Sequence, residues 1–129
     1  MMRPQCGIAT DGAHSTKNRL TRFQAVDIAT GEVLFNESIG NQTINIGEFL
    51  GVVEAVKYII EHNYTPRIIY TDSMTAIAWF HAKRVASKKS HPALKRAEIF
   101  LKTFAAEIES IEVRHWDNAG WGETPADFG

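Results

Sequence analysis

The first third of the chain alternates between short apolar runs and polar segments. Three runs have the length and the β-branched or aromatic content of strands: Gln5–Asp11, Leu20–Ile28 and Glu32–Ile39. The polar segment His14–Arg19 is expected to form a loop, and Ala29–Gly31 to form a short turn between the second and third runs. The pattern therefore predicts three consecutive antiparallel strands.

The hydrophobic period then becomes that of a helix. Over Asn45–Glu61, apolar residues recur every three or four positions. A β-rich run, Arg67–Thr71, predicts a buried strand, and a second helix is expected over Met74–Ala82. Pro92 stands where a helix can begin, because the first turn does not need its missing N–H, and apolar spacing predicts a third helix over Ala93–Glu109.

The last part of the chain predicts one more strand, Ile111–His115, then a loop, and a helical stub over Thr124–Asp127. Strands joined by short turns form an antiparallel meander, whereas strand–helix–strand crossovers add parallel strands. We therefore expect the α/β fold class, as a single domain over residues 1–129. Its five-stranded mixed sheet has three antiparallel leading strands and helices packed against it.

Composition and charge exclude several classes of protein. The chain has 129 residues, 44% hydrophobic and 22% charged, which is typical of a globular domain and not of a disordered chain. Its 14 basic and 15 acidic residues nearly cancel, so any attraction to nucleic acid must come from a local patch. The single cysteine, Cys6, excludes an intrachain disulfide. Without a secretory signal or a long apolar run, we expect a soluble, cytoplasmic protein with no membrane partner.

Four acidic residues fall at the ends of predicted elements. Asp11 ends the first strand, Glu48 lies in the first turn of the first helix, Asp72 follows the fourth strand, and Asp127 lies in the terminal stub. Sites in open α/β sheets form outside strand ends. Carboxylates that converge there repel one another, and Mg²⁺ or Mn²⁺ relieves this repulsion. Two such ions about 4 Å apart can activate water for phosphodiester hydrolysis.

Each acid also has an ordinary structural interpretation. Asp11 begins a common Asp-Gly turn pair, and Asp72 can cap the helix that follows it. Glu48 stands three residues after Asn45, which is the spacing of a capping box, and Asp127 follows a threonine at the same distance. Spacing alone does not show that the four carboxylates converge.

The stretches around these acids resemble the type 1 ribonuclease H family, part of the ribonuclease H-like and retroviral integrase superfamily. The matching stretches keep the family's order and approximate spacing: Ile8–Ala13, Thr43–Glu48, Ile69–Ser73 and Pro125–Asp127. The resemblance implies a ribonuclease H-like fold and a metal-dependent endonuclease that cleaves the RNA strand of an RNA–DNA hybrid with two Mg²⁺ ions. It also implies that the four acids are the catalytic metal ligands: Asp11, Glu48, Asp72 and Asp127.

The roles that follow from the resemblance differ between the acids. Asp11 is expected to bridge both ions, and Asp72 to hold them directly. Glu48 is expected to hold one ion and to sense the ribose 2′-hydroxyl, which distinguishes RNA from DNA. Asp127 is expected to complete the shell of the second ion. A metal-bound water is the nucleophile in such a site, so no serine or cysteine nucleophile is needed.

Further substrate contacts are expected from two places. The resemblance implies that Thr43 or Asn45 meets the substrate backbone. Six basic residues follow the second predicted helix with no acid between them: Lys83, Arg84, Lys88, Lys89, Lys95 and Arg96. A solvated face is the default interpretation of such a run. A patch that binds phosphates, with Lys88 and Lys89 in it, is the functional one, and the family's basic handle lies in this same connection.

Three other functions stay open. They are a catalytically weak or inactive nucleic-acid-binding module on the same fold, a nuclease that acts on structured DNA, and a receiver domain with Asp72 as phosphate acceptor. The leading hairpin argues against the doubly wound sheet of a receiver. Trp79 is expected in the core, whereas Trp116 and Trp121 either cover the site or pack under the place of the C-terminal helix that the family has and this chain almost lacks. We expect a monomer whose partner is an RNA–DNA hybrid.

Overall fold

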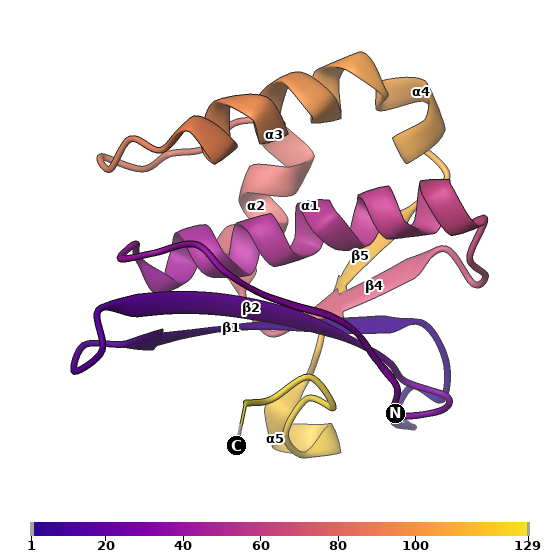
Figure 1. The fold of residues 1–129 in the computed structure, drawn as a ribbon. Helices are drawn as coiled ribbons and strands as arrows, with labels where there is room; N and C mark the ends of the chain where they lie inside the picture. The colour runs from indigo at the N-terminus through magenta and orange to yellow at the C-terminus, as the bar shows by residue number, and fades with distance from the viewer. Residues whose placement is uncertain (1, 129) are drawn as a thin grey trace.

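One five-stranded mixed sheet organises the structure, a computed structural model that describes residues 2–128 (Figure 1). Its strands are β1 (Ile8–Ser15), β2 (Leu20–Asp27), β3 (Val33–Ser38), β4 (Ile68–Thr71) and β5 (Glu112–His115). The spatial order is β3-β2-β1-β4-β5. β1 pairs antiparallel with β2, as β2 does with β3, whereas β4 pairs parallel with β1 and with β5. The predicted fold class and mixed sheet are confirmed, and the antiparallel pairs exclude a receiver domain.

The helices lie in layers on one side of this sheet, apart from the last. They are α1 (Ile44–His62), α2 (Met74–Ala82), α3 (Pro92–Thr103), α4 (Ala105–Ile108) and α5 (Asn118–Trp121). α1 lies along the sheet, α3 and α4 lie beyond α1, and α5 with the C-terminal segment lies on the opposite side (Figure 1). Among residues 2–128, no helix has both the length and the apolar character needed to cross a membrane.

The main core lies between α1 and the sheet. Phe49, Val52 and Val56 of α1 are fully buried, together with Ile8 of β1 and Ile69 of β4. Burial of each such side chain contributes about 1.5–3 kcal/mol to stability. These contacts hold α1 firmly across the strands, which makes the helix a rigid support for any side chain near its start.

Two glycines of α1 set how closely the helix approaches the sheet. A Cβ on Gly47 would lie 2.9 Å from Cγ2 of Thr21, and a Cβ on Gly51 would lie 3.2 Å from Cβ of Phe23. Trp79 of α2 packs edge-on against Phe49 at 5.7 Å between ring centroids, so its predicted place in the core is confirmed.

Two boundaries in the first half differ from the prediction. β1 begins at Ile8 rather than Gln5 and continues to Ser15, so His14 and Ser15 belong to a strand and not to a loop. The physical reason is pairing with β2, which extends from Ile8 opposite Asp27 to Ser15 opposite Leu20. Asp11 is therefore inside a strand, and its interpretation as a turn residue is wrong.

The second half differs in two places. The helix predicted over Ala93–Glu109 is interrupted at Phe104, whose backbone (φ −100°, ψ 25°) is not helical. The stub expected over Thr124–Asp127 is a turn, because the Thr124 hydroxyl accepts from the Ala126 N–H and its carbonyl accepts from the Asp127 N–H. Instead, the loop after β5 contains the short helix α5, which Asp117 caps by accepting from the Gly120 N–H at 3.0 Å.

Candidate metal centre

The seam between β1 and β4 places two aspartates side by side. The last parallel pair along this seam is Thr10 with Thr71, so Asp11 and Asp72 are the next residues on the two strands. Beyond this point β1 continues with β2 as its partner, whereas the chain leaves β4 and turns into α2. The two acids thus stand at the point where the parallel pairing of β1 with β4 ends, as sites in open α/β sheets do.

Helix α1 brings a third acid to the same point. Glu48 lies directly over Gly12 of β1, where an added Cβ would lie 2.6 Å from Cγ of Glu48 and 2.9 Å from its backbone nitrogen. Only glycine leaves room for this approach of helix and strand. The Asp-Gly pair at positions 11 and 12 therefore marks a close helix–strand contact rather than a turn.

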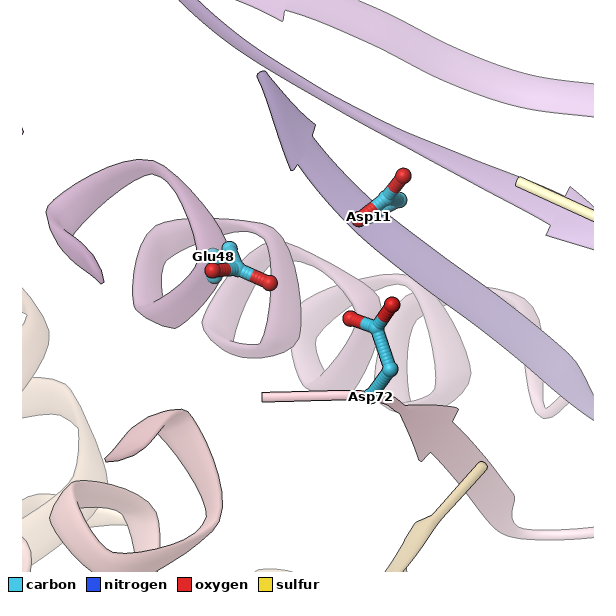
Figure 2. Close-up of side chains that lie close together, drawn as sticks. All are labelled: Asp11, Glu48 and Asp72. Atoms are coloured by element: carbon cyan, nitrogen blue, oxygen red, sulfur yellow. The ribbon is translucent and has the colours of Figure 1, made fainter. Parts of the chain in front are cut away.

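The three carboxylates converge. Oxygen atoms of Asp11, Glu48 and Asp72 all lie within 4.8 Å of one another, and they come from a strand, a helix and the residue after a strand (Figure 2). Asp11 is buried and Asp72 is partly exposed. The ion pairs found among residues 2–128, Lys57 with Glu54 and Arg114 with Glu112, involve none of these acids. The carboxylate oxygens of this centre are hard, anionic ligands, and no basic side chain in the described part of the chain forms an ion pair with them. Such a group fits a divalent cation of the Mg²⁺ or Mn²⁺ type.

Crowding changes the acidity of this group. Burial, followed by the charge of Asp72, raises the pKa of Asp11 from 3.8 to about 7. Burial and then the charges of Asp72 and Asp11 raise the pKa of Glu48 from 4.5 to about 8. Without a metal the centre therefore holds protons near neutral pH, and a divalent cation that binds there must displace them.

The capping interpretations of these acids are wrong. The N-cap of α1 is Thr43, whose hydroxyl accepts from the Ile46 N–H at 3.3 Å, so Glu48 is the fifth helical residue rather than a member of the first turn. The N-cap of α2 is Ser73, whose hydroxyl accepts from the Ala76 N–H at 3.0 Å. Neither Glu48 nor Asp72 caps its helix, so both carboxylates are available to the centre.

Asp127 is placed differently from the other three acids. It is exposed and is not a member of the group within 4.8 Å. Its charge nevertheless contributes to the raised pKa of Asp11, after burial and Asp72, so the two carboxyls are close enough to interact electrostatically. The structure thus brings three of the predicted ligands together and leaves the fourth at the margin of the site.

One residue that the sequence analysis did not assign contacts the centre. Asn118, the first residue of α5, donates its side-chain amide to Oδ2 of Asp72 at 3.0 Å. This bond orients the Asp72 carboxylate. A helix of four residues has too little apolar periodicity to be predicted from sequence, so the position of Asn118 depends on the fold.

The predicted substrate residues lie at the start of α1 and in the connection between α2 and α3. Thr43, Asn45, Lys88 and Lys89 are all exposed. Lys89 donates its Nζ to the carbonyl oxygen of Asn41 at 2.7 Å, which joins the basic connection to the loop before α1. The two predicted contact regions are therefore adjacent in space.

The tryptophans after β5 pack against one another and against Tyr70 of β4. Trp116 is fully buried. Its ring lies 6.0 Å from that of Tyr70 and 5.1 Å from that of Trp121, between centroids. The ring of Trp121 also lies 6.3 Å from that of Tyr70, so the two tryptophans and Tyr70 form one aromatic cluster beside β4.

Comparisons with known proteins agree with this architecture. No model of a protein family matches the chain. Among solved structures it is similar to LC11-RNase H1, isolated from compost, in complex with an RNA/DNA hybrid (18% identity, TM-score 0.57, covering 88% of this chain and 86% of that one). It is also similar to ribonuclease H1 from Halobacterium salinarum (16% identity, TM-score 0.57, covering 88% and 86%). The protease-reverse transcriptase of prototype foamy virus matches 95% of this chain with 18% of its own length (16% identity, TM-score 0.61). The chain thus has the ribonuclease H fold, with an acidic cluster where the pairing of β1 with β4 ends.

Proposed function

We propose that this protein is a divalent-metal-dependent endonuclease that hydrolyses the RNA strand of RNA–DNA hybrids. The observation that carries the proposal is the convergence of three carboxylates from β1, α1 and the end of β4 within 4.8 Å on a ribonuclease H fold. A similar structure was solved in complex with an RNA/DNA hybrid, which supports the choice of substrate.

In this proposal Asp11 and Asp72 would hold two Mg²⁺ ions most directly. Glu48 holds one ion and faces the ribose, where the 2′-hydroxyl distinguishes RNA from DNA. Asp127 completes the shell of the second ion. Such a metal pair, when bound, supplies an activated water and stabilises the leaving oxygen. The protein's own contribution is the rigid placement of the carboxylates on α1 and the two strands.

The substrate is held by groups on the α1 side of the sheet. Thr43 and Asn45 contact the backbone of one strand from the start of α1. Lys88 and Lys89 bind phosphates from the basic connection, which the Lys89–Asn41 hydrogen bond ties to the same loop. Because the net charge is −1, this local patch, and not the overall charge, accounts for attraction to nucleic acid.

The experiment that tests the proposal measures the rate of cleavage of an end-labelled RNA–DNA hybrid with Mg²⁺ or Mn²⁺. A reaction with chelator in place of metal is the negative control. Double-stranded RNA and junction DNA serve as alternative substrates. We expect cleavage of the RNA strand only, its loss in Asp11→Asn, and its retention in Asp27→Asn, which changes an acid at the far end of β2. Cleavage of junction DNA in preference to the hybrid would contradict the substrate assignment.

The exposed position of Asp127 favours one alternative, a nucleic-acid-binding module on the same fold without turnover. That function predicts hybrid binding that is unaffected by Asp11→Asn and no cleavage with either metal. A cytoplasmic location and a monomeric state stay predictions from the sequence. Size-exclusion chromatography with light scattering measures the mass in solution and so checks the monomeric state.

A further inference from the structure

A row of polar side chains crosses the sheet next to the acidic centre. Asp11 of β1 lies opposite Gln24 of β2, and Gln24 lies opposite Asn36 of β3. Residues that face each other across antiparallel strands project from the same face. This face is the one away from α1, because the alternate residues Gly12 and Phe23 contact that helix.

Hydrogen bonds along this row all run in one direction. Arg22 donates to Oδ1 of Asn36 at 2.8 Å, and Asn36 donates its Nδ2 to Oε1 of Gln24 at 2.9 Å. Gln24 then donates its Nε2 to the carbonyl oxygen of Ala126 at 2.6 Å and, more weakly, to that of Asp127 at 3.4 Å. Since arginine can only donate, it sets the orientation of the Asn36 amide, which in turn sets that of Gln24.

The segment that receives these bonds is also anchored by apolar contacts. Ala126 is fully buried in a small cluster with Ala9 and Val26, on the face away from α1. The Arg22 guanidinium lies 5.4 Å from the centre of the Phe128 ring. Asp127 is thus held on both sides, between a buried residue and a ring that packs on a strand side chain.

Gln24 makes polar contacts in this anchor and is itself almost fully buried, at 9% exposure. It joins residues that are 102 positions apart in the sequence. The turn at Thr124 orders the segment locally but does not attach it to the sheet. The Gln24 amide and the small apolar cluster beneath the segment therefore help to set the position of Asp127 relative to Asp11.

We propose that Gln24, oriented by Asn36, is a positioning residue that holds Asp127 beside Asp11 so that the Asp127 carboxylate reaches the divalent-metal site. This inference rests on the proposed function only for the identity of the site. Arg22 and Asn36 contribute indirectly, because their hydrogen bonds fix the orientation of the Gln24 amide. The network explains how Asp127, an exposed acid next to a short turn, keeps a defined position.

The first test measures attachment of the segment without metal or substrate. Gln24→Met keeps the length of the side chain and removes its donor. We expect the amide hydrogens of residues 126–128 to exchange at least about fivefold faster, as for the loss of one hydrogen bond. The matched control is Gln5→Met, which removes the same kind of bond, from Nε2 to the Arg3 carbonyl, at an exposed site. Unchanged exchange in Gln24→Met would overturn the proposal.

The second test measures Mn²⁺ affinity by calorimetry in a double-mutant cycle. We expect Gln24→Met and Asp127→Asn each to weaken Mn²⁺ binding by about tenfold, and the double variant to be no weaker than Asp127→Asn alone. With hybrid as substrate, both single variants should lower kcat and leave KM unchanged. Additive losses, or no loss in Asp127→Asn, would show that Gln24 does not act through Asp127.

These readouts separate the inference from the proposed function. If the wild-type protein cleaves no hybrid, the proposed function fails, whereas exchange and Mn²⁺ affinity still decide the role of Gln24. If Gln24→Met does not fold, Asn36→Asp replaces it. That variant keeps an acceptor for Arg22 but presents an oxygen to Gln24, so the Gln24 amide reverses and its Nε2 leaves Ala126. The same changes in exchange and affinity are then expected.

Discussion

Removal of one charge from the acidic centre should stabilise the metal-free protein. Asp11→Asn is nearly isosteric, and the Gly12 N–H that donates to Oδ1 of Asp11 at 3.0 Å can donate to the amide oxygen instead. The variant therefore keeps the local geometry and removes a charge that is disfavoured first by burial and then by the charge of Asp72. Because both effects exist only in the folded state, their relief raises the free energy of unfolding.

The magnitude follows from the raised pKa. The pKa of Asp11 moves from 3.8 to about 7, and one unit corresponds to about 1.4 kcal/mol. A shift of roughly three units has an upper limit of about 4 kcal/mol. Since solvent reaches part of the site and screens its charges, we expect about half of this, near 2 kcal/mol, at pH 8.

The sign of the pH dependence is defined by the same shift. The folded protein binds the Asp11 proton more tightly than the unfolded chain does, so wild-type stability falls as pH rises from about 4 to about 7. At pH 5 Asp11 is protonated in the folded protein, and the gain from Asp11→Asn should fall below about 1 kcal/mol.

Thermal melts in chelator at pH 5, 6.5 and 8 measure this effect. At pH 8 we expect Asp11→Asn to melt about 8 °C higher than wild type, with a smaller difference at pH 5. Millimolar Mg²⁺ should raise the melting temperature of wild type and should raise that of the variant less, because a ligand that binds only the folded state stabilises it.

Asp27 provides a control of opposite sign. The hydroxyl of Tyr64 donates to Oδ1 of Asp27 at 2.7 Å and lowers the pKa of that carboxyl. Asp27→Asn should therefore lower the melting temperature at pH 8, with an effect that shrinks toward acid pH. An Asp11→Asn protein that melts no higher than wild type at pH 8, or whose advantage does not grow with pH, would refute the account of the centre.

Three further changes test other parts of the structure. Glu48→Gln should lower the rate of hybrid cleavage at least about tenfold, equivalent to roughly 1.4 kcal/mol of transition-state stabilisation. Its melting temperature without metal should be unchanged or raised, and a wild-type rate would remove Glu48 from the site. Replacement of Lys88 and Lys89 by alanine should reduce the salt dependence of hybrid binding by about 0.7 to 0.9 slope units per lost contact, whereas an unchanged slope indicates a solvated face. Gly12→Ala should destabilise the fold by about 1–3 kcal/mol in thermal melts, because its Cβ would lie 2.9 Å from the Glu48 backbone nitrogen; unchanged stability would contradict the close contact.

The sequence by itself determined the order of the elements. Hydrophobic period is a local property, so the change from alternating runs to helical spacing near residue 45 and the return to a strand at Arg67–Thr71 could be read directly. The acids at Asp11 and Asp72 could also be recognised, because each stands near the end of an apolar run. The resemblance of the surrounding stretches to a known family added the expectation that these acids act together with Glu48 and Asp127 as metal ligands.

Tertiary structure decided what those acids do. Asp11 appeared to end a strand, but pairing with β2 carries β1 to Ser15, and this depends on residues that are distant in the chain. Glu48 had the spacing of a capping box, and only the position of Thr43 as the N-cap left its carboxylate available. Convergence within 4.8 Å requires the β1–β4 register and the contact of Gly12 with α1 together.

The C-terminal segment shows the same division most clearly. Thr124–Asp127 has the local pattern of a helix start, yet it forms a turn that is attached to β2 through Gln24, 102 residues from Ala126. No local pattern encodes that hydrogen bond, because its geometry exists only once the sheet has formed. Local periodicity therefore determined the strands and the longer helices of this chain, whereas pairing and packing between distant residues determined which carboxylates meet.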